Sequence, residues 1–73
     1  MDRAAAIQAL STENDEFRRI RDKHKAFEKE LEEFGQRRYL TSDEELAIKQ
    51  IKKSKLVLKD RMEKIIIAYV KSN

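Results

Sequence analysis

Residues 17–34 read FRRIRDKHKAFEKELEEF, and their apolar side chains recur at alternating intervals of three and four residues. Two series with a period of seven result, as at the a and d positions of a coiled-coil helix. The first series is Leu10, Phe17, His24 and Leu31, and the second is Ile20, Phe27 and Phe34.

The last third of the chain carries the same pattern. Its two series are Ile48, Lys55, Met62, Tyr69 and Ile51, Leu58, Ile65. A short connection forces two such helices to run antiparallel. The layers then pair Phe34 with Ile48, Leu31 with Ile51, Phe27 with Lys55, His24 with Leu58, Ile20 with Met62 and Phe17 with Ile65. We therefore predict an all-α fold, an antiparallel two-helix coiled-coil hairpin with a short N-terminal helix, oligomerising into a helix bundle.

Capping residues set the predicted boundaries within one domain, residues 1–73. A short helix covers about residues 2–10 and a long one about 15–34, with Ser11, Thr12 and Asn14 as N-cap types between them. Gly35 is placed at the C′ position, where a left-handed backbone is common. A turn at 35–41 leads to a long helix at about 43–70. That helix starts with a capping box formed by either Thr41 with Glu44 or Ser42 with Glu45.

Composition excludes several classes of protein. The 73 residues include no cysteine, no proline and one glycine, and 42 % are charged. Disulfides, thiolate metal sites and turn-rich β folds are therefore excluded. No stretch is long enough to span a bilayer. We expect a soluble, cytoplasmic helical protein without cofactors, whose small core favours oligomerisation.

His24 and Lys55 are polar residues on the apolar seam. Polar seam residues commonly fix register at some cost in stability, and we assign both residues this role. The alternatives are proton transfer or metal ligation by His24 and anion binding by Lys55. A second histidine and any cysteine are absent. We predict no catalytic, cofactor-binding or metal-binding residue, and no enzyme.

The C-terminal helix has more apolar side chains than one seam needs. Residues 65–70 are continuously apolar, and a second apolar side follows from the helical repeat. Its candidate partner-binding residues are Leu56, Ile66, Ile67 and Val70. A second protomer, favoured as a dimer, another protein, or the short first helix would cover them. The predicted function is a non-enzymatic interaction or self-association module with no membrane role.

A lysine-rich side on the same helix supports an alternative function. Lys49, Lys52, Lys53 and Lys59 lie over one broad side. They could neutralise phosphates in weak, salt-sensitive nucleic-acid binding. No aromatic residue is interleaved for base stacking. The simpler interpretation is a solvated face, salt-bridged to acidic residues of the preceding helix.

The chain resembles the YdcH family of small bacterial proteins, a domain of unknown function. The first matching block consists of Leu10, Asn14, Phe17, Ile20, His24, Phe27 and Leu31. The second consists of Glu45, Leu46, Ile51 and residues 52–60. Departures occur at Asp15, where relatives often have proline, and at Glu28 and Arg61. The resemblance implies a small α-helical hairpin and brings no known activity, cofactor or catalytic residue.

Overall fold

The computed structural model describes residues 2–72, which form three helices and no strand. These are α1 (Arg3–Glu13), α2 (Asp15–Gly35) and α3 (Ser42–Ser72). The molecule is elongated, with extents of 48 × 19 × 16 Å. The all-α fold predicted from the sequence is confirmed. Within residues 2–72, no helix combines the length and hydrophobicity needed to cross a membrane.

Side-chain caps begin each helix. Asp2 Oδ1 accepts a hydrogen bond from Ala5 N at 2.7 Å, and Asn14 Oδ1 accepts one from Phe17 N at 2.9 Å. Only Asn14 leaves the helical conformation between α1 and α2 (φ −114°, ψ 110°). The first helix therefore continues through Ser11 and Thr12 to Glu13, three residues beyond the predicted end.

The capping box of α3 is formed by Thr41 and Glu44. Glu44 N donates to Thr41 Oγ1 at 3.1 Å, and Thr41 N donates to Glu44 Oε1 at 3.0 Å. This reciprocal pair satisfies two backbone donors at the helix start. Of the two predicted pairings, the structure therefore selects the first.

Gly35 differs from its predicted role. It is the last residue of α2, and its φ is not positive. The helix ends instead in a right-handed conformation at Gln36, whose N–H donates to Glu33 O at 3.3 Å. A Cβ at position 35 would meet no atom within 4 Å. Neither space nor backbone geometry requires glycine here, so the left-handed C′ assignment was wrong.

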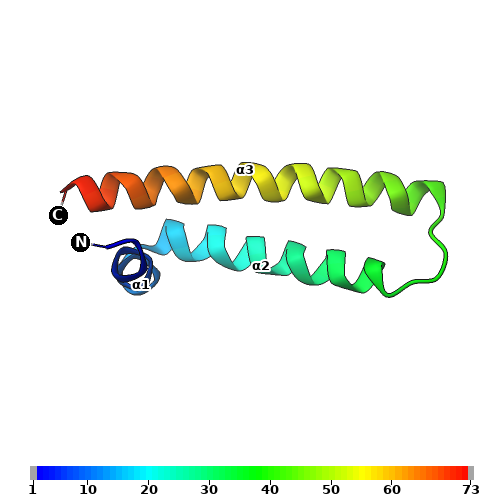
Figure 1. The fold of residues 1–73 in the computed structure, drawn as a ribbon, viewed down its shortest axis with the longest axis horizontal. Coiled ribbons are helices and arrows are strands. Elements are labelled where there is room, and N and C mark those ends of the chain that lie inside the picture. The colour runs from blue at the N-terminus through cyan, green and yellow to red at the C-terminus, as the bar shows by residue number, and fades with distance from the viewer. Residues whose placement is uncertain (1, 73) are drawn as a thin grey trace.

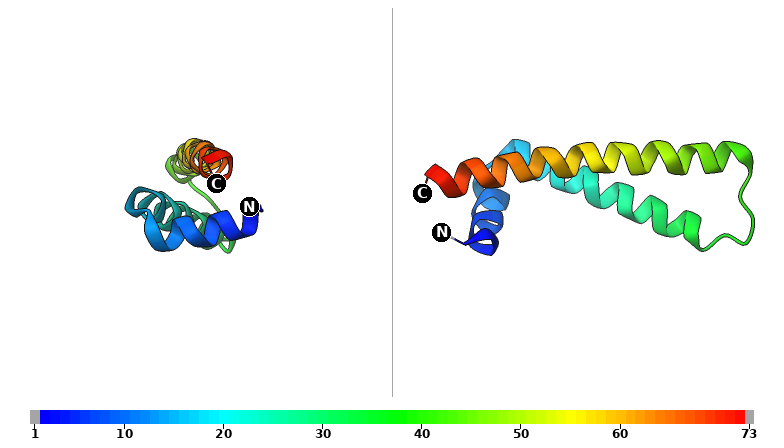
Figure 2. Two further views of the ribbon diagram at one scale, coloured as in Figure 1. Left: turned by 90° about the vertical axis from the view of Figure 1, so that its left-hand side faces the viewer. Right: turned by 45° about the horizontal axis from the view of Figure 1, so that its top comes forward.

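The helices α2 and α3 lie side by side and run antiparallel, while α1 crosses one end of the pair (Figure 1). The predicted seam positions on α2 and α3 are all buried or half-buried. Figure 2 (right) shows α2 leaning away from α3 towards the connecting segment. The two helices are therefore most closely packed beside α1.

The buried core lies where all three helices meet. Its cluster contains Ala6, Leu10, Phe17 and Ile66, and their exposed fractions do not exceed 4 %. We predicted Ile65 as the partner of Phe17, but Ile66 is the buried residue and Ile65 lies at the periphery of the cluster. Because α1 also packs against this part of α3, the most buried side chain of α3 is Ile66 and not its neighbour Ile65.

Candidate functional site

Four large apolar side chains are exposed along α3. They are Leu46, Leu56, Val57 and Ile67, with exposed fractions of 55 %, 60 %, 56 % and 49 %. Successive residues rotate by about 100° around a helix, so positions eleven apart lie about 20° from each other and positions ten apart about 80°. Leu46 and Ile67 each lie ten or eleven positions from Leu56 and Val57, so the four side chains project from one broad side of α3. We call these four residues the outer apolar face, which lies opposite the half-buried seam of α3.

The predicted partner-binding residues divide between this face and the core. Leu56 and Ile67 are exposed on the outer apolar face. Ile66 is only 4 % exposed, and Val70 is half-buried against the core cluster. The assignment of Ile66 and Val70 to a free surface is therefore corrected, because the three-helix core around α1 takes up this part of the apolar surplus.

Two members of the outer apolar face, Leu46 and Val57, were not among the partner-binding residues predicted from the sequence. Their signal was present, since both fall on the same side of the helical wheel as Ile67. The continuous apolar run at 65–70 is the more obvious pattern and masks this wider spacing. The exposed side is spread thinly over the length of α3 and is not concentrated at its C-terminal end.

Charged residues surround the outer apolar face. Lys49, Lys53, Lys64 and Asp60 fall on the same side of the helix and are exposed. Lys52 and Lys59 are also exposed and flank it. Within residues 2–72, none of the four predicted lysines, Lys49, Lys52, Lys53 and Lys59, forms an ion pair. The predicted salt bridges from these lysines to the preceding helix are therefore not formed within the chain, although the charge of Lys59 helps to lower the pKa of Glu63.

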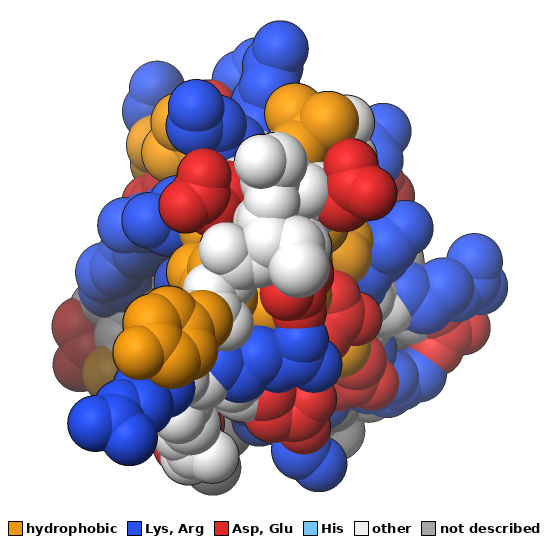
Figure 3. All heavy atoms as spheres, turned by 90° about the vertical axis from the view of Figure 1, so that its right-hand side faces the viewer, with side chains coloured by type: hydrophobic (Ala, Val, Ile, Leu, Met, Phe, Trp, Pro, Cys, Tyr) orange, Lys and Arg blue, Asp and Glu red, His pale blue; other side chains and the backbone are white. Residues whose placement is uncertain are grey.

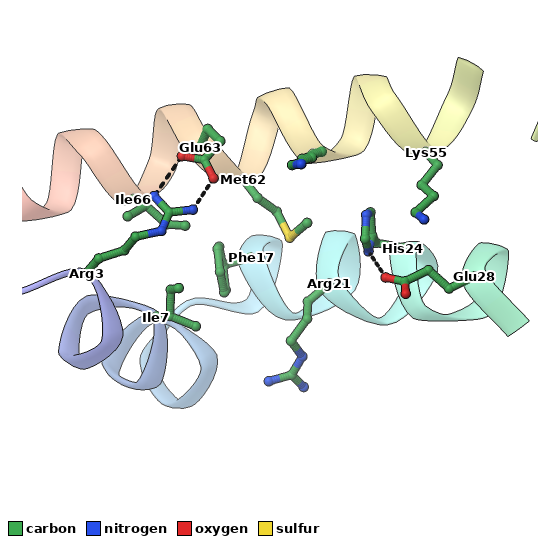
Figure 4. Close-up of a pocket in the computed structure, with 11 residues that line it drawn as sticks. Arg3, Ile7, Phe17, Arg21, His24, Glu28, Lys55, Met62, Glu63 and Ile66 are labelled. Atoms are coloured by element: carbon green, nitrogen blue, oxygen red, sulfur yellow. Dashed lines mark hydrogen bonds and ion pairs between the residues drawn. The ribbon is translucent and has the colours of Figure 1, made fainter. Parts of the chain in front are cut away.

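The predicted polar seam residues line a groove of about 410 Å³ between the helices (Figure 4). His24 Nδ1 lies 2.9 Å from Glu28 Oε1, a distance at which Nδ1–H donates to the carboxylate. The His24 side chain is 16 % exposed, and Nε2 is buried without a hydrogen-bond partner. Lys55 is half-buried and extends towards the same groove.

An ion pair closes the α1 end of this groove. Arg3 makes two hydrogen bonds to the Glu63 carboxylate, one of them at 2.8 Å. This hydrogen bonding lowers the pKa of Glu63 below its ordinary value of 4.5 and raises the pKa of Arg3. The described residues that line the groove include no serine, threonine or cysteine nucleophile. Within residues 2–72, no group of three acidic or histidine side chains could hold a metal ion.

The connecting segment at residues 36–41 presents a different surface. Arg37 forms an ion pair with Glu44 and lies over the Phe34 ring at 5.2 Å from its centroid. Tyr39 is 82 % exposed. Viewed from this end, acidic and basic side chains are interspersed with small, separate hydrophobic patches (Figure 3). Within residues 2–72, the large exposed apolar side chains other than Tyr39 all lie on the outer apolar face of α3.

Comparison with known proteins returned one finding. The family model of DUF465, described as a protein of unknown function, matches residues 17–66. The match spans most of α2 and α3 and agrees with the resemblance to the YdcH family. No curated protein and no solved structure matches the chain.

Proposed function

Because the chain belongs to the DUF465 family, whose function is unknown, its own surfaces must supply the functional argument, and we propose that it is a non-enzymatic helical module that self-associates through the outer apolar face of α3. The observation that carries this proposal is the placement of four half-exposed aliphatic side chains on one side of α3. Single exposed apolar residues need no explanation, whereas an aligned set indicates a contact surface.

The expected strength of association follows from the size of this face. Burying a fully exposed aliphatic side chain contributes about 1.5–3 kcal/mol. Because these side chains are about half exposed, each would add about 1 kcal/mol, or about 8 kcal/mol for a pair of chains. Association costs at least about 4 kcal/mol in lost freedom of motion. About 4 kcal/mol remains at the lowest association cost, so the dimer is weak, with an expected dissociation constant of about 1 mM.

Nucleic-acid binding is the second candidate, because within residues 2–72 no carboxylate forms an ion pair with Lys49, Lys52, Lys53 or Lys59. Phosphate neutralisation by such lysines would give affinity that falls steeply with salt. The outer apolar face has no role in this alternative. Titration of short RNA and DNA at low salt checks it, and absence of binding there excludes it.

Sedimentation equilibrium between about 100 µM and about 5 mM, a range that brackets the expected dissociation constant, tests self-association. The parent chain is expected to show a monomer–dimer equilibrium that depends little on salt, because apolar burial drives it. Leu56→Ser combined with Ile67→Ser should keep the chain monomeric. Tyr39→Ser removes a more exposed apolar side chain away from α3 and should leave association unchanged.

Two results would contradict the proposal. The first is a parent chain that stays monomeric at about 5 mM, well above the dissociation constant of about 1 mM expected from the outer apolar face. The second is a Leu56→Ser/Ile67→Ser variant that associates like the parent, which would place the contact elsewhere. Circular dichroism of each variant confirms that the helical content is retained.

A further inference from the structure

We infer that two copies of this chain pack antiparallel along α3, with a twofold axis passing between Leu56 and Val57. This inference rests on the proposed self-association and names its partner and geometry. Figure 2 (left) shows α1 and α2 on one side of α3, so the opposite side is free along the helix. A straight helix face uncovered over this length can accept a second helix.

The spacing of the outer apolar face carries the inference. Leu46 lies ten residues before Leu56, and Ile67 lies ten residues after Val57. A twofold contact is isologous, so each residue meets its counterpart at an equal distance beyond the axis. Leu56 of one copy therefore lies opposite Val57 of the other, and Leu46 lies opposite Ile67. All four exposed side chains then find an apolar neighbour in a single register.

Charge along the same face agrees with this register. Lys53 lies three residues before Leu56, and Asp60 lies three residues after Val57. Antiparallel pairing consequently places Lys53 of each copy opposite Asp60 of the other, forming two opposite-charge pairs beside the axis. Lys49 lies opposite Lys64 by the same rule. These long side chains can extend to solvent while their methylene groups stay over the contact.

Parallel pairing satisfies the apolar residues but not the charges. It would set Lys53 against Lys53 and Asp60 against Asp60, with no opposite-charge pair at the four charged positions of this face. Like-charge contacts across an interface are unfavourable and suppress the wrong partner or orientation. The charge pattern therefore selects the antiparallel arrangement.

Single cysteines test this geometry directly, because the chain has none of its own. Mild oxidation should join two copies of Val57→Cys, whose positions are offset by about 1.5 Å along the axis. Two Leu46→Cys copies should not join, because antiparallel pairing separates them by about 32 Å. An equal mixture of Leu46→Cys and Ile67→Cys should give the mixed disulfide, identifiable by its mass. Ser54→Cys, exposed on the flank of α3, is the matched control and should stay monomeric.

A charge exchange gives a second readout without cysteine. Lys53→Asp alone and Asp60→Lys alone would each create two like-charge contacts per dimer. Each should weaken dimerisation several-fold at low salt. The double variant restores both opposite-charge pairs with reversed sign and should recover the parent affinity.

The outcomes separate this inference from the proposed function. Disulfides between two Leu46→Cys copies, with none in the mixture, would show parallel pairing and overturn the inference while retaining self-association through this face. Dimers in sedimentation without any disulfide at positions 46, 57 or 67 would overturn both. Failure of the double charge variant to recover affinity would overturn the antiparallel register.

Discussion

The two ends of the molecule use the same heptad pattern but differ in burial. At the end where α1 crosses, Ala6, Leu10, Phe17, Ile20 and Ile66 are fully buried. Towards the connecting segment, the corresponding seam residues Phe27, Leu31, Phe34, Ile48 and Ile51 are only half-buried. Within residues 2–72, every fully buried side chain belongs to the three-helix end.

The third helix accounts for this difference in burial. Two helices meet along a narrow stripe and leave both edges of the seam open to water, whereas a third helix closes one edge. A small domain buries little apolar surface in total. The few side chains buried at the three-helix end should therefore supply most of the free energy of folding. Substitutions at the two ends should therefore differ in their effect on stability.

Phe17→Ala should lower the free energy of unfolding by about 3–5 kcal/mol, the usual cost of deleting a buried phenylalanine. Phe27→Ala, at a half-buried seam position, should cost about 1 kcal/mol. Urea unfolding followed by circular dichroism at one protein concentration compares the two. Equal losses would mean that the two ends are equally well packed.

Ala6→Leu should destabilise the chain by about 1–3 kcal/mol, because Ala6 is 0 % exposed and a larger side chain would overpack the contact of α1 with the core. Ala4→Leu, on an exposed position of the same helix, should change stability by less than about 0.5 kcal/mol. Thermal unfolding distinguishes them. A neutral Ala6→Leu would indicate that α1 is not tightly docked.

His24→Leu should raise the free energy of unfolding by about 1 kcal/mol, because it removes a buried Nε2 that lacks a partner. Lys55→Leu should act in the same direction. Glu28→Gln, which weakens only the pairing with His24, serves as the control and should slightly lower stability. If the double variant His24→Leu/Lys55→Leu unfolds at a lower temperature than the parent, the register-setting interpretation is wrong.

Gly35→Ala should stabilise the open end by about 0.5–1 kcal/mol, because alanine restricts the unfolded chain and the native φ suits it. Gln36→Ala, just beyond the helix, should have a smaller effect. The midpoint of urea unfolding provides the measurement. Loss of stability in Gly35→Ala would mean that the helix ends in a left-handed conformation after all.

The ion pair between Arg3 and Glu63 should produce a small pH dependence. The depressed pKa of Glu63 means that the contribution is present above about pH 4.5 and is lost as the pH falls through the folded-state pKa. Melting temperatures from neutral pH down to about pH 3 should fall less steeply in Glu63→Gln and in Arg3→Gln. A decline as steep as that of the parent in both variants would contradict this origin.

Much of this fold could be predicted because the apolar residues of the seam between α2 and α3 recur every seven residues. The position of α1 could not, because alanines are spread around that helix and mark no single apolar side. The assignment of Ile66 to the partner-binding surface was wrong for the same reason, because the position of α1 was not predicted. Ile66 and Ile67 are adjacent and chemically identical, and only the three-helix packing around α1 makes one a core residue and the other a surface residue.

The start of α1 and the end of α3 lie at the same end of the molecule (Figure 1). A flexible linker joining them, with new termini opened within residues 36–41, would give a circular permutant with the helix order α3, α1, α2. Its connectivity would bring Arg3 and Glu63, sixty positions apart in the natural chain, close together in sequence. The three-helix core would then be built from segments closer in sequence, whereas seam pairs beside the new termini, such as Phe34 with Ile48, would become the most distant ones. The permutant should therefore form its core contacts before the open end of the seam.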